Sequence, residues 1–349
     1  MYLNFPVETK IDIIKCLNFN QMTAIQQINR HFFELINKYL KELPRQKFSS
    51  MQITRGEYTG NIIKPEPFNF ELSEELNRKW CSAIFGRIFI CYSYKTLKAF
   101  TRSFHKKVRF FSEINFPSCK PIYLYLPIYP KNTLDMEILY CVFYQLSQCF
   151  FEKIEFDRVV FNPKIFELLF DYDKPIKFLC GNILQLTLCK PLFDKNAFKL
   201  FQKNLSISGI VNVNAFSNHR LYNQEYEKII LEFLLKGGDQ IPQIAINSMT
   251  LEINYFDKLI NHTKTSSDIL KMIADIDIRS IRCLRPNMID KATKIKEGKS
   301  FNEVDKTSCI YYKYEISNLH NKNVMFFVTL WQPLSFTFFT RFQIKRVFK

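Results

Sequence analysis

The feature that most constrains the fold is a strand-then-helix rhythm that recurs along most of the chain. Apolar, strand-like runs begin near residues 88, 122, 154, 184, 210, 244 and 276, so successive runs start 26–34 residues apart. Helix-like segments such as residues 134–148, 223–236 and 252–263 lie between them. A unit repeated at such a spacing predicts either a solenoid or βαβ units in a parallel sheet.

Within two of these runs, polar and apolar residues alternate. Side chains in a strand point alternately to opposite faces, which predicts that Glu155, Asp157, Gln185 and Thr187 share one face. The unit resembles that of leucine-rich-repeat proteins, although those repeats usually span only about 20–29 residues. The resemblance implies an irregular solenoid that binds a partner on its concave face. The alternative is a compact, non-repeating α/β domain.

The C-terminal segment has a different pattern. Residues 309–316, 324–330 and 336–344 are rich in β-forming residues, and residues 317–323 form a polar, loop-like break between the first two. Terminal repeats of a solenoid need a cover for their open edge. These residues therefore predict a small β-rich cap.

Most signatures of catalysis and metal binding are missing. The chain has 8 glycines and no Gly-rich loop, and it has neither a Gly-x-Ser-x-Gly nor a His-Glu-x-x-His motif. Its 10 cysteines include no Cys-x-x-Cys pair, and its 5 histidines are scattered. We expect reduced, structural cysteines, no catalytic residue, no metal and no cofactor, and hence a protein that is not an enzyme. An active site assembled from distant residues is the remaining alternative.

Residues 4–40 are predicted to form three short helices. Pro6 suits a first helical position, and apolar residues recur at helical spacing in each segment. Three such helices bury too little surface to be stable alone, which indicates that some of their apolar surface faces a partner or the following domain. The alternative is that they are the first helical layer of a larger core.

The same residues resemble the F-box. The resemblance rests on Phe5-Pro6-Val7-Glu8 and on the aliphatic and aromatic residues Ile11, Ile14, Leu17, Met22, Ile25, Ile28, Phe32 and Phe33. The chain departs from the motif by Phe5 in place of Leu and by Ile28-Asn29 in place of Val-Ser. The resemblance implies a module that docks on the Skp adaptor of a cullin–RING ubiquitin ligase, while the downstream domain selects a protein target.

Carried over by position, the resemblance names candidate adaptor contacts. They are Phe5, Pro6, Ile14, Leu17, Met22 and Ile28. Ile11, Ile25 and Phe32 could equally form the internal core of the helices.

The formal net charge of +16 is unevenly distributed. Residues 76–112 contain nine basic residues and no acidic one, interleaved with aromatic residues, a pattern typical of nucleic-acid binders. The same residues also fit a strand at 88–92 and a helix at 95–108 whose basic side chains face solvent. We favour this second interpretation and regard nucleic acid as an unlikely partner. An acidic or phosphorylated protein target also suits a basic chain.

The sequence as a whole predicts an α/β fold with a three-helix F-box at residues 1–42 and a linker at 43–75. An irregular leucine-rich-repeat-like strand–helix solenoid follows at 76–300, with a small β-rich C-terminal cap at 301–349. We expect a non-catalytic substrate-recognition subunit of a Skp–cullin–F-box ligase, with a basic nucleic-acid-binding protein as the alternative. The longest uncharged apolar runs, such as residues 324–331, are too short to span a bilayer, and residues 6–12 are too charged for a secretion signal. The expected location is therefore the cytoplasm or the nucleus, away from membranes.

Overall fold

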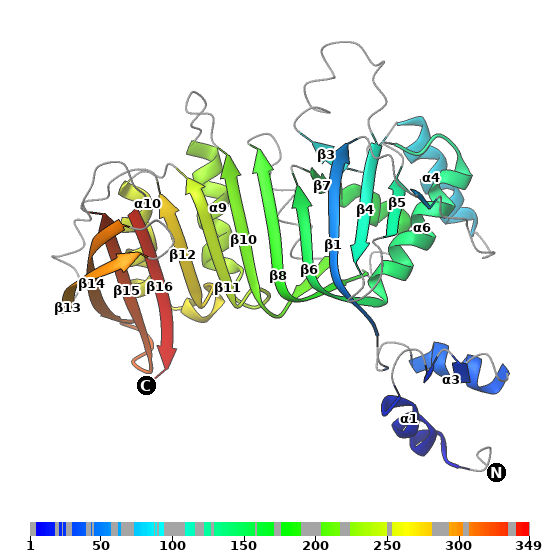
Figure 1. The fold of residues 1–349 in the computed structure, drawn as a ribbon, viewed down its shortest axis with the longest axis horizontal. Helices are drawn as coiled ribbons and strands as arrows, with labels where there is room; N and C mark the ends of the chain where they lie inside the picture. The colour runs from blue at the N-terminus through cyan, green and yellow to red at the C-terminus, as the bar shows by residue number, and fades with distance from the viewer. Residues whose placement is uncertain are drawn as a thin grey trace.

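The computed structural model contains one large mixed β-sheet with helices packed on one face (Figure 1). The residues that the structure describes are 5–17, 21–22, 24–25, 30–39, 43, 45–56, 62–63, 73–86, 88, 91–93, 109–115, 122–126, 129–157, 159–170, 176–189, 204–216, 224–249, 253–280, 293–302, 307–333 and 340–348.

The centre of the sheet is parallel. Its strands, in spatial order, are β1 (Gln46–Gly56), β6 (Cys149–Asp157), β8 (Phe178–Cys189), β10 (Ile210–Phe216), β11 (Gln243–Met249) and β12 (Asp275–Ser280). The short β9 (Leu205–Ile207) pairs in parallel with the start of β8. Apart from β1, the neighbours in this central part follow one another along the chain.

Both flanks of the sheet are mainly antiparallel. Beyond β12 lie β16 (Thr340–Phe348), β15 (Val324–Pro333), β14 (Thr307–Ser317) and β13 (Thr293–Asn302). Beyond β1 lie β4 (Arg109–Asn115), β5 (Ile122–Leu126) and β2 (Ile62–Ile63), of which β2 pairs in parallel with β5. A separate pair is formed by β3 (Cys91–Ser93) and β7 (Val159–Phe161).

One row of buried side chains joins the parallel centre to the C-terminal flank. The register places in this row Ile53, Phe156, Leu186, Val213, Ile246, Ile278, Phe342 and Leu330. All of them are at most 2% exposed and belong to one continuous apolar core. Because the row crosses from β12 to β16 without interruption, the C-terminal strands share the core of the central strands.

The helices that cover this row are α4 (Glu74–Phe85), α6 (Thr133–Ser147), α7 (Pro163–Leu169), α9 (Gln224–Lys236), α10 (Ile253–Thr265) and the 3₁₀ turn η4 (Ile269–Lys271). Several begin at side-chain caps, in which Ser73 Oγ accepts from Leu76 N and Asn132 Oδ1 accepts from Asp135 N. Figure 1 shows α9 and α10 behind the sheet. Trp80 of α4 is fully buried, and its indole Nε1 donates to the carbonyl of Leu168 in α7 at 3.1 Å.

Two helices precede the sheet, α1 (Val7–Lys15) and α3 (Arg30–Tyr39). They have a small core of their own, formed by Ile11, Ile14, Met22, Leu35, Ile36 and Leu43. Figure 1 shows both helices beyond the start of β1, away from the sheet. The predicted second helix of this region lies mostly outside the described residues.

The predicted fold class is wrong. Most of the described chain is one large mixed sheet, rather than a three-helix F-box followed by a strand–helix solenoid and a separate cap. The strands predicted near residues 122, 154, 184, 210, 244 and 276 are nevertheless present as β5, β6, β8, β10, β11 and β12. Local pattern located strands correctly, but it carries no information on which strands pair, and pairing decides the architecture.

Two pairings account for the difference. Within the stretch predicted as a linker, β1 pairs with β6 on one side and with β4 on the other. At the C-terminal end, β16 pairs with β12 and so extends the same sheet, where a cap was expected. Both pairings join segments that are far apart in sequence.

Candidate partner-binding surfaces

The N-terminal helical module, defined as described residues 5–43, is built around its small core. Pro6 stands directly before α1, with Glu8 in the first turn near the positive end of the helix. Ile11, Ile14 and Ile36 face inward and are 7%, 2% and 0% exposed. This core does not include residues of the sheet, so the module carries its own packing.

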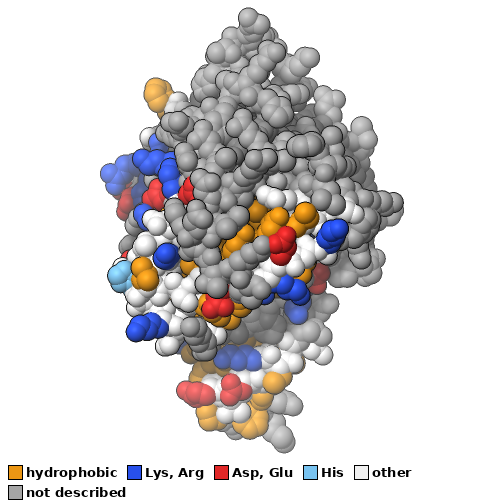
Figure 2. Space-filling view, turned by 90° about the vertical axis from the view of Figure 1, so that its left-hand side faces the viewer, with side chains coloured by type: hydrophobic (Ala, Val, Ile, Leu, Met, Phe, Trp, Pro, Cys, Tyr) orange, Lys and Arg blue, Asp and Glu red, His pale blue; other side chains and the backbone are white. Residues whose placement is uncertain are grey.

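The outer surface of this module is unusually apolar. An exposed apolar set lies on it, consisting of Phe5, Val7, Ile13 and Phe33, with exposed fractions of 44%, 40%, 40% and 50%. Figure 2 shows the module as the lobe at the bottom, with apolar side chains exposed beside acidic ones. Apolar side chains left exposed on a small module are candidates for a protein–protein contact.

The predicted adaptor contacts fall into three groups. Phe5 and Pro6 are exposed, and Leu17 is partly exposed. Ile14 and Met22 are each 2% exposed and lie in the small core, so they support the module from inside and offer little surface to a partner. Ile28 lies outside the described residues.

Three exposed residues were missing from that prediction, namely Val7, Ile13 and Phe33. The sequence held a signal for Phe33, because apolar residues in α3 extend around more than one face of the helix. A helix with apolar residues on more than one face cannot bury all of them against the small core of the module. Spacing alone could not tell which of them point outward.

A second surface is the face of the sheet opposite the helices, called the open face below. The register places in one row across it Gln52, Glu155, Gln185, Asn212, Ala245, Asp277, Gln343, Thr329 and Lys313. All are partly exposed except Asp277, which is 7% exposed. The prediction that Glu155, Asp157, Gln185 and Thr187 share one face is confirmed by the pairing of β6 with β8.

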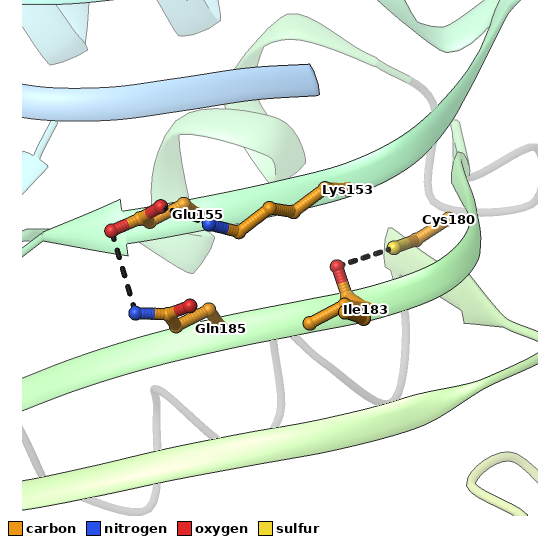
Figure 3. Close-up of polar contacts among 5 residues, drawn as sticks. All are labelled: Lys153, Glu155, Cys180, Ile183 and Gln185. Carbon is orange, nitrogen blue, oxygen red and sulfur yellow. Dashed lines mark hydrogen bonds and ion pairs between the residues drawn. The ribbon is translucent and has the colours of Figure 1, made fainter. Parts of the chain in front are cut away.

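In the parallel part of the open face, Lys153 and Glu155 form an ion pair. Lys153 Nζ lies 2.7 Å from Glu155 Oε2, and Gln185 Nε2 donates to Glu155 Oε1 at 3.5 Å (Figure 3). One row further along, Asn247 Nδ2 donates to Asn214 Oδ1 at 3.0 Å. This part is therefore rich in amides, which can both donate and accept hydrogen bonds.

In the C-terminal part, a fork of hydrogen bonds joins β12 to β16. Arg341 Nε and Nη2 donate to the two carboxylate oxygens of Asp277, each at 2.9 Å. The same guanidinium lies over the ring of Trp331, 4.7 Å from its centroid. Such bidentate pairs fix both position and orientation, so this arginine and this tryptophan are held in place before any partner binds.

Two cysteine thiols, those of Cys149 and Cys180, have low nucleophilicity. Burial raises the pKa of Cys149 to about 12, although the nearby Arg45 opposes the shift, and burial raises the pKa of Cys180 to about 11. Cys180 Sγ also donates to the carbonyl of Ile183 at 3.1 Å (Figure 3). Both thiols are therefore protonated near neutral pH, and the thiolate is the reactive form.

Two features are absent from the part of the chain that the structure describes. It contains no group of three His, Cys, Asp or Glu side chains that could hold a metal ion. None of its helices combines the length and the apolar character needed to cross a bilayer.

The basic stretch at residues 76–112 is described only in part. Its first residues belong to α4, and the strand expected at 88–92 corresponds to the short β3. The helix expected at 95–108 lies outside the described residues. The nucleic-acid alternative therefore stays a prediction.

Comparison with known proteins gives one match. Residues 62–217 match the model of a family described as a domain of unknown function, DUF8381. In the structure this range runs from β2 to β10. No curated protein and no solved structure matches the chain. The matched range excludes the N-terminal helical module, β1 and the strands from β11 onward. In the sheet, β1 lies between the matched strands β4 and β6, and the unmatched strands from β11 onward extend the sheet beyond β10.

Proposed function

We propose that the chain is the substrate-recognition subunit of a Skp–cullin–F-box ubiquitin ligase and has no catalytic role of its own. In this proposal the N-terminal helical module binds a Skp-type adaptor, and through it a cullin–RING ligase. The sheet then recruits a protein target, which is ubiquitylated by the rest of the complex.

The observation that carries the proposal is the exposed apolar set on a module with a core of its own. Burying the exposed half of one such side chain contributes roughly 1 kcal/mol, so the four together contribute on the order of 4 kcal/mol to association. Leaving them in water would lose this contribution. Covering these side chains would contribute to association with a partner, and the F-box resemblance of the same residues supports a Skp-type adaptor as that partner.

The separate core of the module is consistent with one partner binding the module and another binding the sheet. Because the small core of the module contains no residue of the sheet, a partner can bind the module without rearranging the sheet. The open face of the sheet is at the same time left uncovered by the described helices, which pack on the opposite face. Two independent surfaces on one chain suit a protein that holds two partners at once.

The test is isothermal titration of the full chain with a purified Skp-type adaptor. The interface variant is Phe33→Asp, and the matched control is Phe85→Asp, which places the same charge at a side chain that is 94% exposed at the end of α4. We expect saturable binding by the unchanged chain, roughly tenfold or greater weakening by Phe33→Asp, and no change with Phe85→Asp.

Two results would overturn the proposal. One is the absence of heat and of complex formation with an intact chain whose circular dichroism shows a folded sheet. The other is equal weakening by both aspartates, because this would reflect the added charge and not the module.

A further inference from the structure

The C-terminal end of the open face carries a cluster of aromatic and basic side chains, here called the aromatic patch. Its members are Lys296, Tyr311, Lys313, Phe327, Trp331 and Arg341. In the register Tyr311 lies opposite Trp331, and Trp331 lies opposite Arg341, so these three side chains adjoin on one face of β14, β15 and β16. Figure 2, which faces this end of the molecule, shows apolar side chains exposed there among basic and acidic ones.

The aromatic side chains of the patch are held in defined positions. A Cβ placed at Gly298 would come within 2.8 Å of the Tyr311 ring, which shows that the ring lies directly over this glycine of β13. Trp331 is covered on one side by the guanidinium of Arg341, itself anchored by Asp277. Partly exposed Trp, Tyr and Arg that are already ordered are the residue types that dominate binding energy in protein interfaces.

The two lysines of the patch favour a partner with negatively charged groups. Lys296 and Lys313 lie directly opposite each other on β13 and β14, and like charges in this position destabilise a sheet. No acidic side chain in the described part of the chain forms an ion pair with either lysine. Lys313 Nζ lies 4.1 Å from the centroid of the Phe327 ring, so positive charge and apolar surface adjoin. An anionic group would relieve the repulsion between the two lysines.

The surroundings favour a protein segment over a nucleic acid. Asp275 and Glu315 lie on the same face, where they alternate with basic residues that include Arg279 and Lys345, and the charge of Arg341 is neutralised by Asp277. A phosphate backbone needs a continuous basic track, and these carboxylates interrupt it. A peptide needs only one or two carboxylates above the lysines and an apolar side chain against the rings.

We propose that the aromatic patch binds an acidic segment of a partner protein that also carries a large aromatic side chain. The acidic residues lie above Lys296 and Lys313, and the aromatic side chain packs against Trp331 and Tyr311. The identification of this partner as the protein targeted for ubiquitylation rests on the proposed function, whereas the binding chemistry of the patch does not.

The chain supplies its own reporter for the test. It has two tryptophans, of which Trp80 in α4 is fully buried and Trp331 in the patch is partly exposed. Full-length protein labelled with 5-fluorotryptophan gives one ¹⁹F resonance for each, and Trp331→Phe assigns them. The probe is a twelve-residue peptide with six acidic residues and two phenylalanines. Its controls are the same peptide with lysine at every acidic position, the same peptide with serine for phenylalanine, and a twelve-nucleotide oligouridine.

We expect the acidic, aromatic peptide to shift the Trp331 resonance and leave that of Trp80 unchanged. The pair Lys296→Glu and Lys313→Glu should weaken this binding roughly tenfold or more. The matched control changes two exposed lysines of the helices on the other side of the sheet, Lys228→Glu and Lys258→Glu, and should leave the affinity unchanged. The two double variants carry the same change in net charge, so the comparison isolates the position of the charges.

Several outcomes would overturn the proposal. They are an unshifted Trp331 resonance at saturating peptide, equal binding of the lysine peptide, equal losses in both pairs of variants, and tighter binding of oligouridine at the same resonance. Titrating the unchanged chain with the adaptor and, separately, with the peptide distinguishes this proposal from the proposed function. Adaptor binding without peptide binding would overturn only the proposal for the aromatic patch. Peptide binding without adaptor binding would overturn only the proposed ligase function.

Discussion

Phe342 provides a direct test of the continuous core. The residue is fully buried in β16 and lies in register with Ile278 of β12 and Leu330 of β15. Its ring packs edge-to-face against Phe256 of α10, with the centroids 4.7 Å apart. Truncation by Phe342→Ala removes these contacts and leaves a cavity, which costs about 3–5 kcal/mol in a well-packed core. At about 2 °C per kcal/mol for a protein of this size, the melting temperature should fall by roughly 6–10 °C.

The assay follows unfolding by two probes in a Trp331→Phe background, which leaves Trp80 as the only tryptophan. Trp80 lies in α4, on the part of the core that packs against α7, far along the sheet from Phe342. If the core is continuous, Trp80 fluorescence and far-UV circular dichroism should shift together. The matched control is Phe348→Ala, on the same strand but 62% exposed, which should change the free energy of unfolding by less than about 1 kcal/mol.

A split result would refute the reasoning. If Phe342→Ala moves the circular dichroism transition and leaves the Trp80 transition in place, the C-terminal strands unfold as a separate unit. The milder Phe342→Leu variant, which keeps most of the apolar volume, serves if the alanine variant does not fold.

Two further predictions concern ionisable side chains. The pKa of Cys149 is raised from 9.0 to about 12, so its thiolate fraction near pH 8 is roughly a thousandfold below that of an ordinary cysteine. N-ethylmaleimide should therefore label the exposed Cys16 and Cys81 well before Cys149. Mass spectrometry after timed quenching checks this, and early labelling of Cys149 would contradict it. Burial lowers the pKa of His262 below its ordinary value of 6.5, so the unfolded chain binds more protons than the folded one as pH falls below about 6.5, and stability should drop in that range. Urea titrations from pH 7.5 to 5 should show this slope, and His262→Gln should flatten it; an unchanged slope in the variant would assign the effect to other groups.

The strands and helices of the centre were predictable because they are local. The alternation of Ile154, Phe156 and their polar neighbours is a period of two that any half-buried strand must show, and β6, β8, β10 and β11 were located from it. The helices α6, α9 and α10 were found from their apolar spacing in the same way.

The architecture was not predictable from the same pattern. The pairing of Gln46 with Cys149 and of Ile276 with Ile344 depends on contacts between distant segments, which leave no mark in local composition. The candidate sites show the same limit. Helical spacing identified Ile14 and Met22 as apolar positions of the N-terminal helical module, but the direction in which each side chain points is set by packing, and both point inward. The aromatic patch could not be predicted from the sequence, because its members come from four strands that adjoin only after the C-terminal strands have paired.

The position of β1 has a consequence for synthesis of the chain. β1 is paired on both sides, with β4 and with β6. The first residue of β1, Gln46, pairs with Cys149 of β6, which is synthesised only after the whole of β4, β5 and α6. At the usual elongation rate of about 5–20 residues per second, the ribosome needs roughly 5–20 s to deliver that partner. During this interval the apolar side chains Met51 and Ile53 lack the parallel strands beside them, because β2, β4 and β5 are the sheet partners made before β6, although the helices before β1 can already pack. A nascent chain stalled in this window is where binding by a cotranslational chaperone should be greatest.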